Sequence, residues 1–172
     1  MPRPKTTALR NHTMLIGVVS DTHANVQATR QAVRMLESLD ASAAIHCGDV
    51  GTAAVVELFE GLPTHFVLGN VDHPRMLEEA IDRAGQTCHG RFGTLELGGR
   101  NVAFLHGDDL RRLHETIGSG DWDLVCHGHT HCANTFRQGN TVVLNPGAVA
   151  DADGPSVAVV ETASLRVTPV SI

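Results

Sequence analysis

Three short apolar runs follow one another in the first half of the chain, and each ends abruptly in polar residues. The runs have the length and the partly β-branched composition of buried strands, and they cover 15–19, 43–46 and 64–68. A segment with the apolar spacing of an amphipathic helix follows each run, over 26–39, 52–60 and 74–83. Successive βα units of this kind predict an α/β fold with a largely parallel sheet.

The second half of the chain changes character and is dominated by strand patterns. Two strands joined by the Gly98-Gly99 turn are followed by a helix that starts after Asp108 or Asp109 and runs to about Ile117. The remaining predicted strands cover 124–126, 133–137, 141–144, 156–160 and 165–170. A parallel half followed by an antiparallel half predicts two sheets packed together, with helices outside.

The length of 172 residues suits one domain of ordinary size, which we place over 14–172. Residues 1–13 lack a periodic pattern and are interpreted as a flexible N-terminal tail. Since Met14 opens the first predicted strand, translation from Met14 is a further hypothesis.

The net charge of −6 and the pI near 5.9 argue against bulk electrostatic binding of nucleic acid or of a membrane surface. No apolar run approaches the roughly 20 residues of a membrane helix, and 14–19 is too short for the core of a signal peptide. The four cysteines are scattered, which favours reduced thiols that serve as small core residues. We therefore expect a cytoplasmic protein without a membrane partner.

A cluster of histidines follows the strand predicted at 124–126. His127, His129 and His131 alternate with other residues in a segment that Cys126 and Cys132 flank. This spacing matches no amphipathic pattern of a core, and histidine is the commonest protein ligand of transition metals. The alternative is a solvated polar loop, because short His-x-His motifs often occur without a metal.

Further polar residues stand just beyond the carboxyl ends of predicted strands, where ligands gather in open α/β sheets. Each residue has an ordinary explanation on its own, such as a helix cap, a turn or a buried histidine. Together they predict one shared crevice, to which the Asn145-Pro146-Gly147 turn is a further candidate contributor. The candidate site residues are Asp21, His23, Asp49, Asn70, His106, His129 and His131.

Five ordered motifs resemble those of the calcineurin-like metallophosphoesterases, and the short chain resembles their single-domain phosphodiesterase branch. The motifs are Asp21-Thr22-His23, Gly48-Asp49, Gly69-Asn70-Val71-Asp72, His106-Gly107 and Gly128-His129-Thr130-His131. The resemblance implies a four-layer α/β/β/α sandwich of mixed sheets with two divalent ions. It assigns one ion to Asp21, His23, Asp49 and His131, and the other to Asp49, Asn70, His106 and His129.

The reaction implied by this resemblance is hydrolysis of a small phosphodiester by in-line attack of a hydroxide that bridges the two ions. The assigned catalytic residues are Asp49, Asn70, His106 and Asp72. Mixed nitrogen and oxygen ligands suit Mn²⁺, our first expectation, and also Fe, Ni²⁺ or Zn²⁺. The substrate's identity and a homo-oligomeric state stay open.

The chain departs from the family pattern at Val71, where the family usually has a histidine that acts as general acid or stabilises the transition state. The short branch commonly lacks this histidine. Asp72 or His73 is a candidate replacement, and a substrate whose leaving group needs no proton is the other explanation. The alternative interpretation of His73 is an exposed residue at the start of a helix.

Three alternative functions remain at this point. One is an interaction scaffold of the same fold with weak or no activity, although the seven ligand positions are intact, and another is a phosphomonoesterase. The third is a structural zinc site of Cys126, His129, His131 and Cys132, which leaves Asp21 and the other candidates unexplained. His46 and His127 adjoin the site and are either supporting donors or packing residues.

Overall fold

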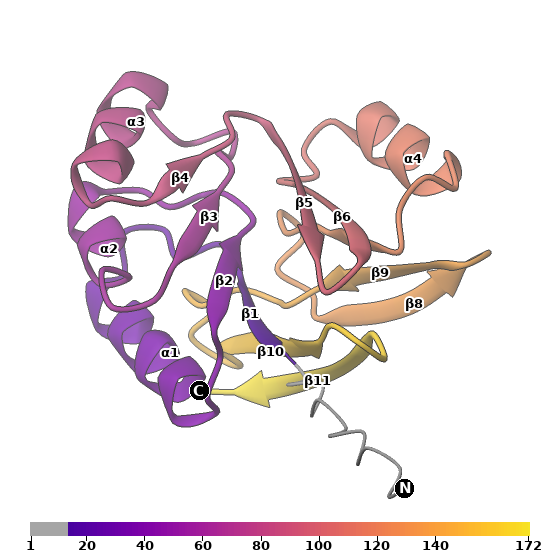
Figure 1. Cartoon of the computed structure of the whole chain (residues 1–172). Coiled ribbons are helices and arrows are strands. Elements are labelled where there is room, and N and C mark those ends of the chain that lie inside the picture. The colour runs from indigo at the N-terminus through magenta and orange to yellow at the C-terminus, as the bar shows by residue number, and fades with distance from the viewer. Residues whose placement is uncertain (1–13) are drawn as a thin grey trace, which may run out of the picture.

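Two β-sheets lie face to face in the computed structural model, which describes residues 14–172, and helices cover their outer surfaces (Figure 1). One apolar cluster fills the space between the sheets, and two others lie between a sheet and its helices. This arrangement confirms the predicted α/β/β/α sandwich. The expected tail at 1–13 lies outside the described residues.

The first sheet contains the three predicted parallel strands, β1 (Leu15–Val19), β2 (Ala43–His46) and β3 (Thr64–Phe66). A two-residue parallel strand, β4 (Thr87–Cys88), extends one edge and is too short to produce a sequence signal. The other edge is formed by β10 (Ser156–Glu161) and β11 (Arg166–Ser171), and β10 pairs antiparallel with β1. The strand order is β11-β10-β1-β2-β3-β4.

The second sheet has the order β5-β6-β7-β9-β8. Its strands are β5 (Phe92–Leu97), β6 (Arg100–Leu105), β7 (Leu124–Cys126), β8 (Asn134–Gln138) and β9 (Thr141–Asn145). The prediction of a purely antiparallel second half is wrong, because β6, β7 and β9 pair parallel and the last two strands return to the first sheet. Strand periodicity reports which face is buried and carries no information on the pairing partner.

Four helices connect the strands, and side chains cap three of them at their N-termini. They are α1 (Val26–Ser38), α2 (Ala53–Glu57), α3 (Pro74–Arg83) and α4 (Leu110–Gly118). Asn25 caps α1, His73 caps α3 and Asp109 caps α4. Helix α2 is shorter than predicted, because residues 58–60 continue as tight turns before Gly61 and Pro63.

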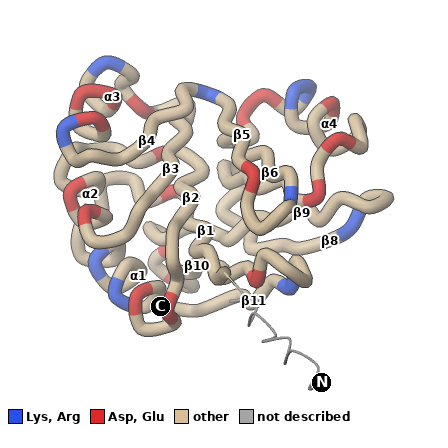
Figure 2. The backbone as a smooth tube through the Cα atoms, viewed as in Figure 1, with Lys and Arg blue, Asp and Glu red and all other residues tan. Residues whose placement is uncertain are grey.

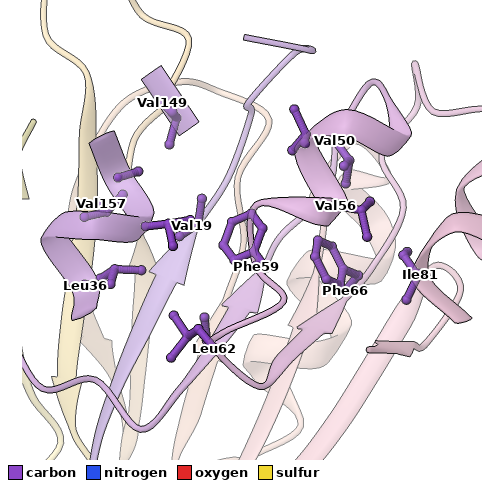
Figure 3. Close-up of a cluster of buried hydrophobic side chains, with 14 of the residues drawn as sticks. Val19, Leu36, Val50, Val56, Phe59, Leu62, Phe66, Ile81, Val149 and Val157 are labelled. Carbon is purple, nitrogen blue, oxygen red and sulfur yellow. The ribbon is translucent and has the colours of Figure 1, made fainter. Parts of the chain in front are cut away.

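The largest apolar cluster packs α1, α2 and α3 against the first sheet (Figure 3). Phe59 and Phe66 meet edge to face at its centre, with ring centroids 5.5 Å apart. All four cysteines are free. Cys47 and Cys126 are core residues as predicted, whereas Cys88 is half-buried and Cys132 is exposed, which corrects the expectation that all four lie in the core.

Charged residues of both signs are interspersed along α1, α3 and α4 (Figure 2). None of the helices in the described part of the chain has the length and apolar character needed to span a membrane.

Candidate metal centre

The structure brings together all seven ligand candidates, from five loops that follow strand ends. The loops follow β1, β2 and β3 in the first sheet and β6 and β7 in the second. The carboxyl ends of these strands meet at one edge of the sandwich, as the βα order predicts.

The first group of donor atoms surrounds the buried carboxylate of Asp21. Asp21 Oδ1 lies 3.3 Å from His131 Nε2 and 3.6 Å from His23 Nε2. The two imidazole nitrogens are themselves 3.1 Å apart. Asp49 Oδ2 approaches His23 Nε2 at 3.7 Å and completes the group.

The second group is built around the imidazole of His106. His106 Nε2 lies 3.2 Å from Asp49 Oδ2 and 3.0 Å from Asn70 Oδ1. His129 Nδ1 approaches the same nitrogen at 3.3 Å. Asp49 Oδ2 therefore belongs to both groups.

The donor spacing fits coordinated metal ions. Ligand atoms about 2.1 Å from a common ion lie about 3.0–3.4 Å apart in octahedral or tetrahedral geometry. The three closest donor distances, 3.0 Å for His106 to Asn70, 3.1 Å for His23 to His131 and 3.2 Å for His106 to Asp49, agree with this range. Asp21 Oδ1 is buried and accepts no hydrogen bond among the described residues, which is costly for a carboxylate oxygen without a cation beside it.

Left-handed backbone conformations concentrate at these ligand candidates. Such conformations are uncommon for residues with a Cβ and cost about 1–3 kcal/mol each, so the surrounding structure must hold them. They turn the chain sharply at the strand ends and direct successive side chains into the crevice. The candidates with positive φ are Asp21 (55°), His23 (42°), Asp49 (54°), His129 (71°) and His131 (60°).

His46 links the loop after β1 to the loop after β2 through hydrogen bonds. The Gly48 N–H donates to His46 Nδ1 at 3.2 Å, so the opposite nitrogen, Nε2, carries the proton and donates to Thr22 Oγ1 at 3.1 Å. Thr22 in turn donates to the Val50 carbonyl at 3.0 Å. Burial lowers the pKa of His46 to about 3, which keeps the ring neutral, and the ring also stacks on Phe66. His46 is thus both a supporting residue and a packing residue.

Hydrogen bonding also orients His106. Its Nδ1 lies 2.8 Å from the Cys47 carbonyl, to which only an N–H can donate, so Nε2 faces the cluster as the free ligand atom. Burial acts to lower the pKa of His106, but the hydrogen bond and charge of Asp49 raise it above its ordinary value. Burial likewise opposes ionisation of Asp49, and the contacts with His106 and the Val71 N–H nevertheless lower the pKa of Asp49.

The Asp72 carboxylate accepts hydrogen bonds from three backbone N–H groups. Its Oδ2 accepts from the Gly69 N–H at 2.8 Å and the Val50 N–H at 3.2 Å, and its Oδ1 accepts from the Gly51 N–H at 2.9 Å. These contacts indicate a positioning residue that joins the loops after β2 and β3. They lend no support to Asp72 as the replacement for the histidine that is absent at Val71.

The neighbours of Asp72 are exposed. Val71 has 58% of its surface exposed, and its N–H donates to Asp49 Oδ1 at 3.2 Å. His73 accepts a long hydrogen bond of 3.5 Å from the Met76 N–H and caps α3, which agrees with its reading as an exposed residue at a helix start.

Asp21 is held by the loop after β7. Its Oδ2 accepts from Ser20 Oγ at 2.6 Å and from the His129 N–H at 3.1 Å. Gly128 allows this approach, because a Cβ there would overlap Ser20 Oγ and lie 2.6 Å from Asp21 Oδ2. The sequence pattern contains no indication of the contact between Gly128 and Ser20, since the two residues lie in loops that follow strands of different sheets.

Asn145 holds the loop after β7 through hydrogen bonds. Its Nδ2 donates to the Gly128 carbonyl at 3.0 Å and to Thr130 Oγ1 at 2.9 Å, and its Oδ1 accepts from the Gly147 N–H at 3.0 Å. Gly147 therefore acts on the site through Asn145. The Asn-Pro-Gly turn was the sequence signal for this support.

Neither cysteine of the alternative zinc site belongs to a donor group among the described residues. Cys126 is buried and burial raises the pKa of its thiol, while Cys132 is exposed. His127 donates from Nδ1 to the Gly128 carbonyl at 3.2 Å, and burial lowers its pKa. The geometry thus favours the aspartate and histidine clusters over a Cys₂His₂ site.

Residues 14–165 match the family model described as the calcineurin-like phosphoesterase superfamily domain. A protein named phosphodiesterase from Methanocaldococcus jannaschii is 30% identical over 138 residues, which cover 78% of this chain and 83% of that relative. A probable metallophosphoesterase from Methanothermobacter thermautotrophicus is also 30% identical, over 78% of this chain and 77% of the relative.

A solved structure described as a novel archaeal phosphodiesterase superposes with a TM-score of 0.86 at 26% identity, over 92% of this chain and 100% of that chain. Vacuolar protein sorting 29 from Cryptosporidium parvum has a TM-score of 0.64 at 16% identity, covers 93% of this chain and 97% of its own, and shares the fold alone. From the family match, the identity to these relatives and the intact motifs, the chain belongs to the calcineurin-like phosphoesterase superfamily.

Proposed function

We propose that this chain is a metal-dependent phosphodiesterase with two divalent ions at the paired donor groups. One ion is held by Asp21, His23, His131 and Asp49, and the other by Asp49, Asn70, His106 and His129. The observation that carries the proposal is the position of Asp49 Oδ2, 3.7 Å from His23 Nε2 and 3.2 Å from His106 Nε2. A carboxylate in this position would serve as a ligand to both ions.

When bound, the two ions would supply positive charge for binding a phosphate ester and would lower the pKa of water for attack at phosphorus. Asp21 and Asp49 offset only part of that charge, since the histidines and Asn70 are neutral ligands. With both ions bound, the site would be locally positive, although the net charge of the chain is −6.

The remaining groups position the donors and supply no nucleophile. The Cys47 carbonyl holds the His106 ring, and the Val71 N–H holds the Asp49 carboxylate. Burial raises the pKa values of Cys47 and Cys126, so both thiols stay protonated. We therefore expect direct attack by water without a covalent enzyme intermediate. A phosphoenzyme trapped during turnover, or hydrolysis in oxygen-18 water that leaves the released phosphate group unlabelled, would contradict this mechanism.

One observation favours diesters over monoesters as substrates, and another favours a substrate with a good leaving group. The relative with 30% identity is named a phosphodiesterase. In addition, Val71 offers no proton to a poor leaving group, which favours activated diesters such as bis(p-nitrophenyl) phosphate. Mn²⁺ is the first metal to test, with Fe, Ni²⁺ and Zn²⁺ as the other expected ions.

The deciding experiment measures bound metal and hydrolysis of bis(p-nitrophenyl) phosphate for the wild type and for Asp49→Asn. We expect two ions per chain in the wild type, and in the variant loss of metal with a decrease in kcat/KM of about 10³-fold or more. Asp121→Asn is the matched control, because this carboxylate is exposed and lies outside both donor groups.

Three outcomes would contradict the proposal. They are a single tightly bound zinc ion, equal or faster turnover of phosphomonoesters, and no turnover of any ester by the metal-loaded protein. The last outcome would favour an interaction scaffold.

A further inference from the structure

A groove with a volume of about 330 Å³ runs between α4 and the edge strand β8. Helix α4 packs against the second sheet, of which β8 is an edge strand. The volume of the groove is within the range of small-molecule sites in proteins. The groove is separate from the metal-ligand candidates, none of which lines it.

Part of the groove wall is apolar. Leu113 and Ile117 line it from α4, and Phe136 lines it from β8. Phe136 has 42% of its surface exposed. An aromatic ring at the side of an open groove offers a flat surface on which another ring can stack.

Two amide side chains flank Phe136 on the same face of β8. Asn134 and Gln138 both line the groove, and neither side chain makes a hydrogen bond among the described residues. At the end of the groove away from the metal centre, Gln138 lies close to α4. Its Nε2 would be 3.9 Å from a Cβ added at Gly118. Each amide offers a donor and an acceptor, the pair of groups that reads the edge of a nucleobase.

The near end of the groove adjoins the proposed metal centre. Thr130 and Cys132 line this end, and they alternate along the chain with the ligand candidates His129 and His131. Asn145, which is buried, holds Thr130 Oγ1 at 2.9 Å and fixes the loop between the groove and the centre. The loop that carries His129 and His131 thus borders both the metal centre and the groove.

We propose that the α4–β8 groove binds the base of a nucleoside-containing phosphodiester, with the base stacked on Phe136 and its edge facing Asn134 and Gln138. This inference rests on the proposed function. It identifies the ester group that stays attached to phosphorus during hydrolysis as a nucleoside. It makes Phe136 a specificity-determining residue.

The test compares two substrates that share one leaving group, thymidine 5′-(p-nitrophenyl phosphate) and methyl p-nitrophenyl phosphate. We expect the Mn²⁺-loaded wild type to prefer the nucleoside ester in kcat/KM by about tenfold or more, the usual effect of one base–aromatic stack. Phe136→Ala removes most of this preference and leaves turnover of the methyl ester unchanged. Thr135→Ala, the neighbouring change on exposed β8 at a residue that does not line the groove, keeps the preference.

A preference that persists in Phe136→Ala, or a wild type without preference, overturns the inference while the proposed function stands. Loss of turnover of both substrates in the wild type contradicts the proposed function itself. In that case calorimetry with thymidine 5′-monophosphate still tests the groove: tighter binding than inorganic phosphate, reduced in Phe136→Ala, supports it, and equal binding overturns it. A change from oligomer to monomer in Phe136→Ala with unchanged kinetics also overturns it, because the groove is then a subunit interface.

Discussion

The Nε2 atoms of His23 and His131 lie 3.1 Å apart, although the two residues are 108 positions apart in the chain. Two imidazole nitrogens at this distance repel each other unless a proton or a cation lies between them. The same atoms lie 3.6 Å and 3.3 Å from Asp21 Oδ1, which makes a shared cation the better match to the donor set.

Removal of metal is expected to destabilise the protein. A ligand that binds only the native state stabilises it by about 2.7 kcal/mol at a hundred times its Kd, so Mn²⁺ should raise the melting temperature above that in EDTA. The rise should shrink in His131→Ala, which removes one donor of the first group. An equal rise in both proteins, measured by differential scanning calorimetry, would speak against coordination by His131.

Gly128→Ala should damage the site, because a Cβ at this position overlaps Ser20 Oγ and crowds the Asp21 carboxylate. Overpacking of this kind costs about 1–3 kcal/mol in unfolding free energy, and a ligand displaced by about 1 Å costs about 10²-fold in kcat. Gly154→Ala is the matched control, since nothing lies within 4 Å of a Cβ there. Urea unfolding and kinetics measured together check both effects.

Asp72→Asn should weaken the junction between the loops that carry Asp49 and Asn70. The amide nitrogen of Asn cannot accept hydrogen bonds, so at least one of the three N–H groups that contact Asp72 loses its partner. An unsatisfied buried group costs about 1–3 kcal/mol, and we expect this loss in denaturant unfolding together with weaker metal binding. Asp82→Asn on α3, an exposed site, serves as control, and equal stability of the two variants would refute the positioning role.

His46 should make the protein less stable at acid pH. Its pKa is about 3 in the folded state, against an ordinary value of 6.5 for an unburied histidine, so between these values the unfolded chain binds a proton that the folded ring rejects. Above pH 6.5 this effect leaves the free energy of unfolding unchanged. Below pH 6.5 it lowers the free energy of unfolding by up to about 1.4 kcal/mol per pH unit. Between pH 7 and pH 5 the wild type should therefore lose about 2 kcal/mol more than His46→Gln, as measured by urea unfolding at each pH. His114→Gln controls for loss of an exposed histidine.

Val71→His should increase the hydrolysis of diesters with poor leaving groups. Val71 is exposed beside Asp49, at the position where family members usually have a histidine. A general acid contributes about 10²–10⁴-fold at its best, and we expect a gain of at least about tenfold for alkyl leaving groups. Little change is expected for p-nitrophenolate, which leaves without a proton. Val71→Gln separates proton donation from polarity, and an equal gain in that variant would exclude general acid catalysis.

Much of the candidate site follows from the sequence alone. The runs at 15–19, 43–46 and 64–68 predict parallel strands, and parallel strands place the residues after their carboxyl ends at one edge of the sheet. Asp21, His23, Asp49 and Asn70 are found there. His129 and His131 follow from the same rule applied to β7, together with the resemblance in their motif.

For the residues that support the ligands, the sequence offers His46 and the Asn145 turn as candidates and does not show the contacts that they make. His46, Asp72 and Asn145 act through hydrogen bonds to side-chain or backbone groups that lie far from them in the chain or in another loop. Asp72 was therefore assigned a chemical role that its contacts do not support. Only the folded structure shows which donors a buried carboxylate or amide meets.

The sequence by itself determined the order of strands and helices and the residue types at the strand ends, because apolar periodicity and turn chemistry act over a few neighbouring residues. Tertiary structure decided that β10 and β11 return to the first sheet, that Asp49 Oδ2 lies between two donor groups, and that a groove opens beside β8. These features depend on which distant backbone and side-chain groups become neighbours, and hydrogen-bond satisfaction and packing settle that only when the whole chain is folded.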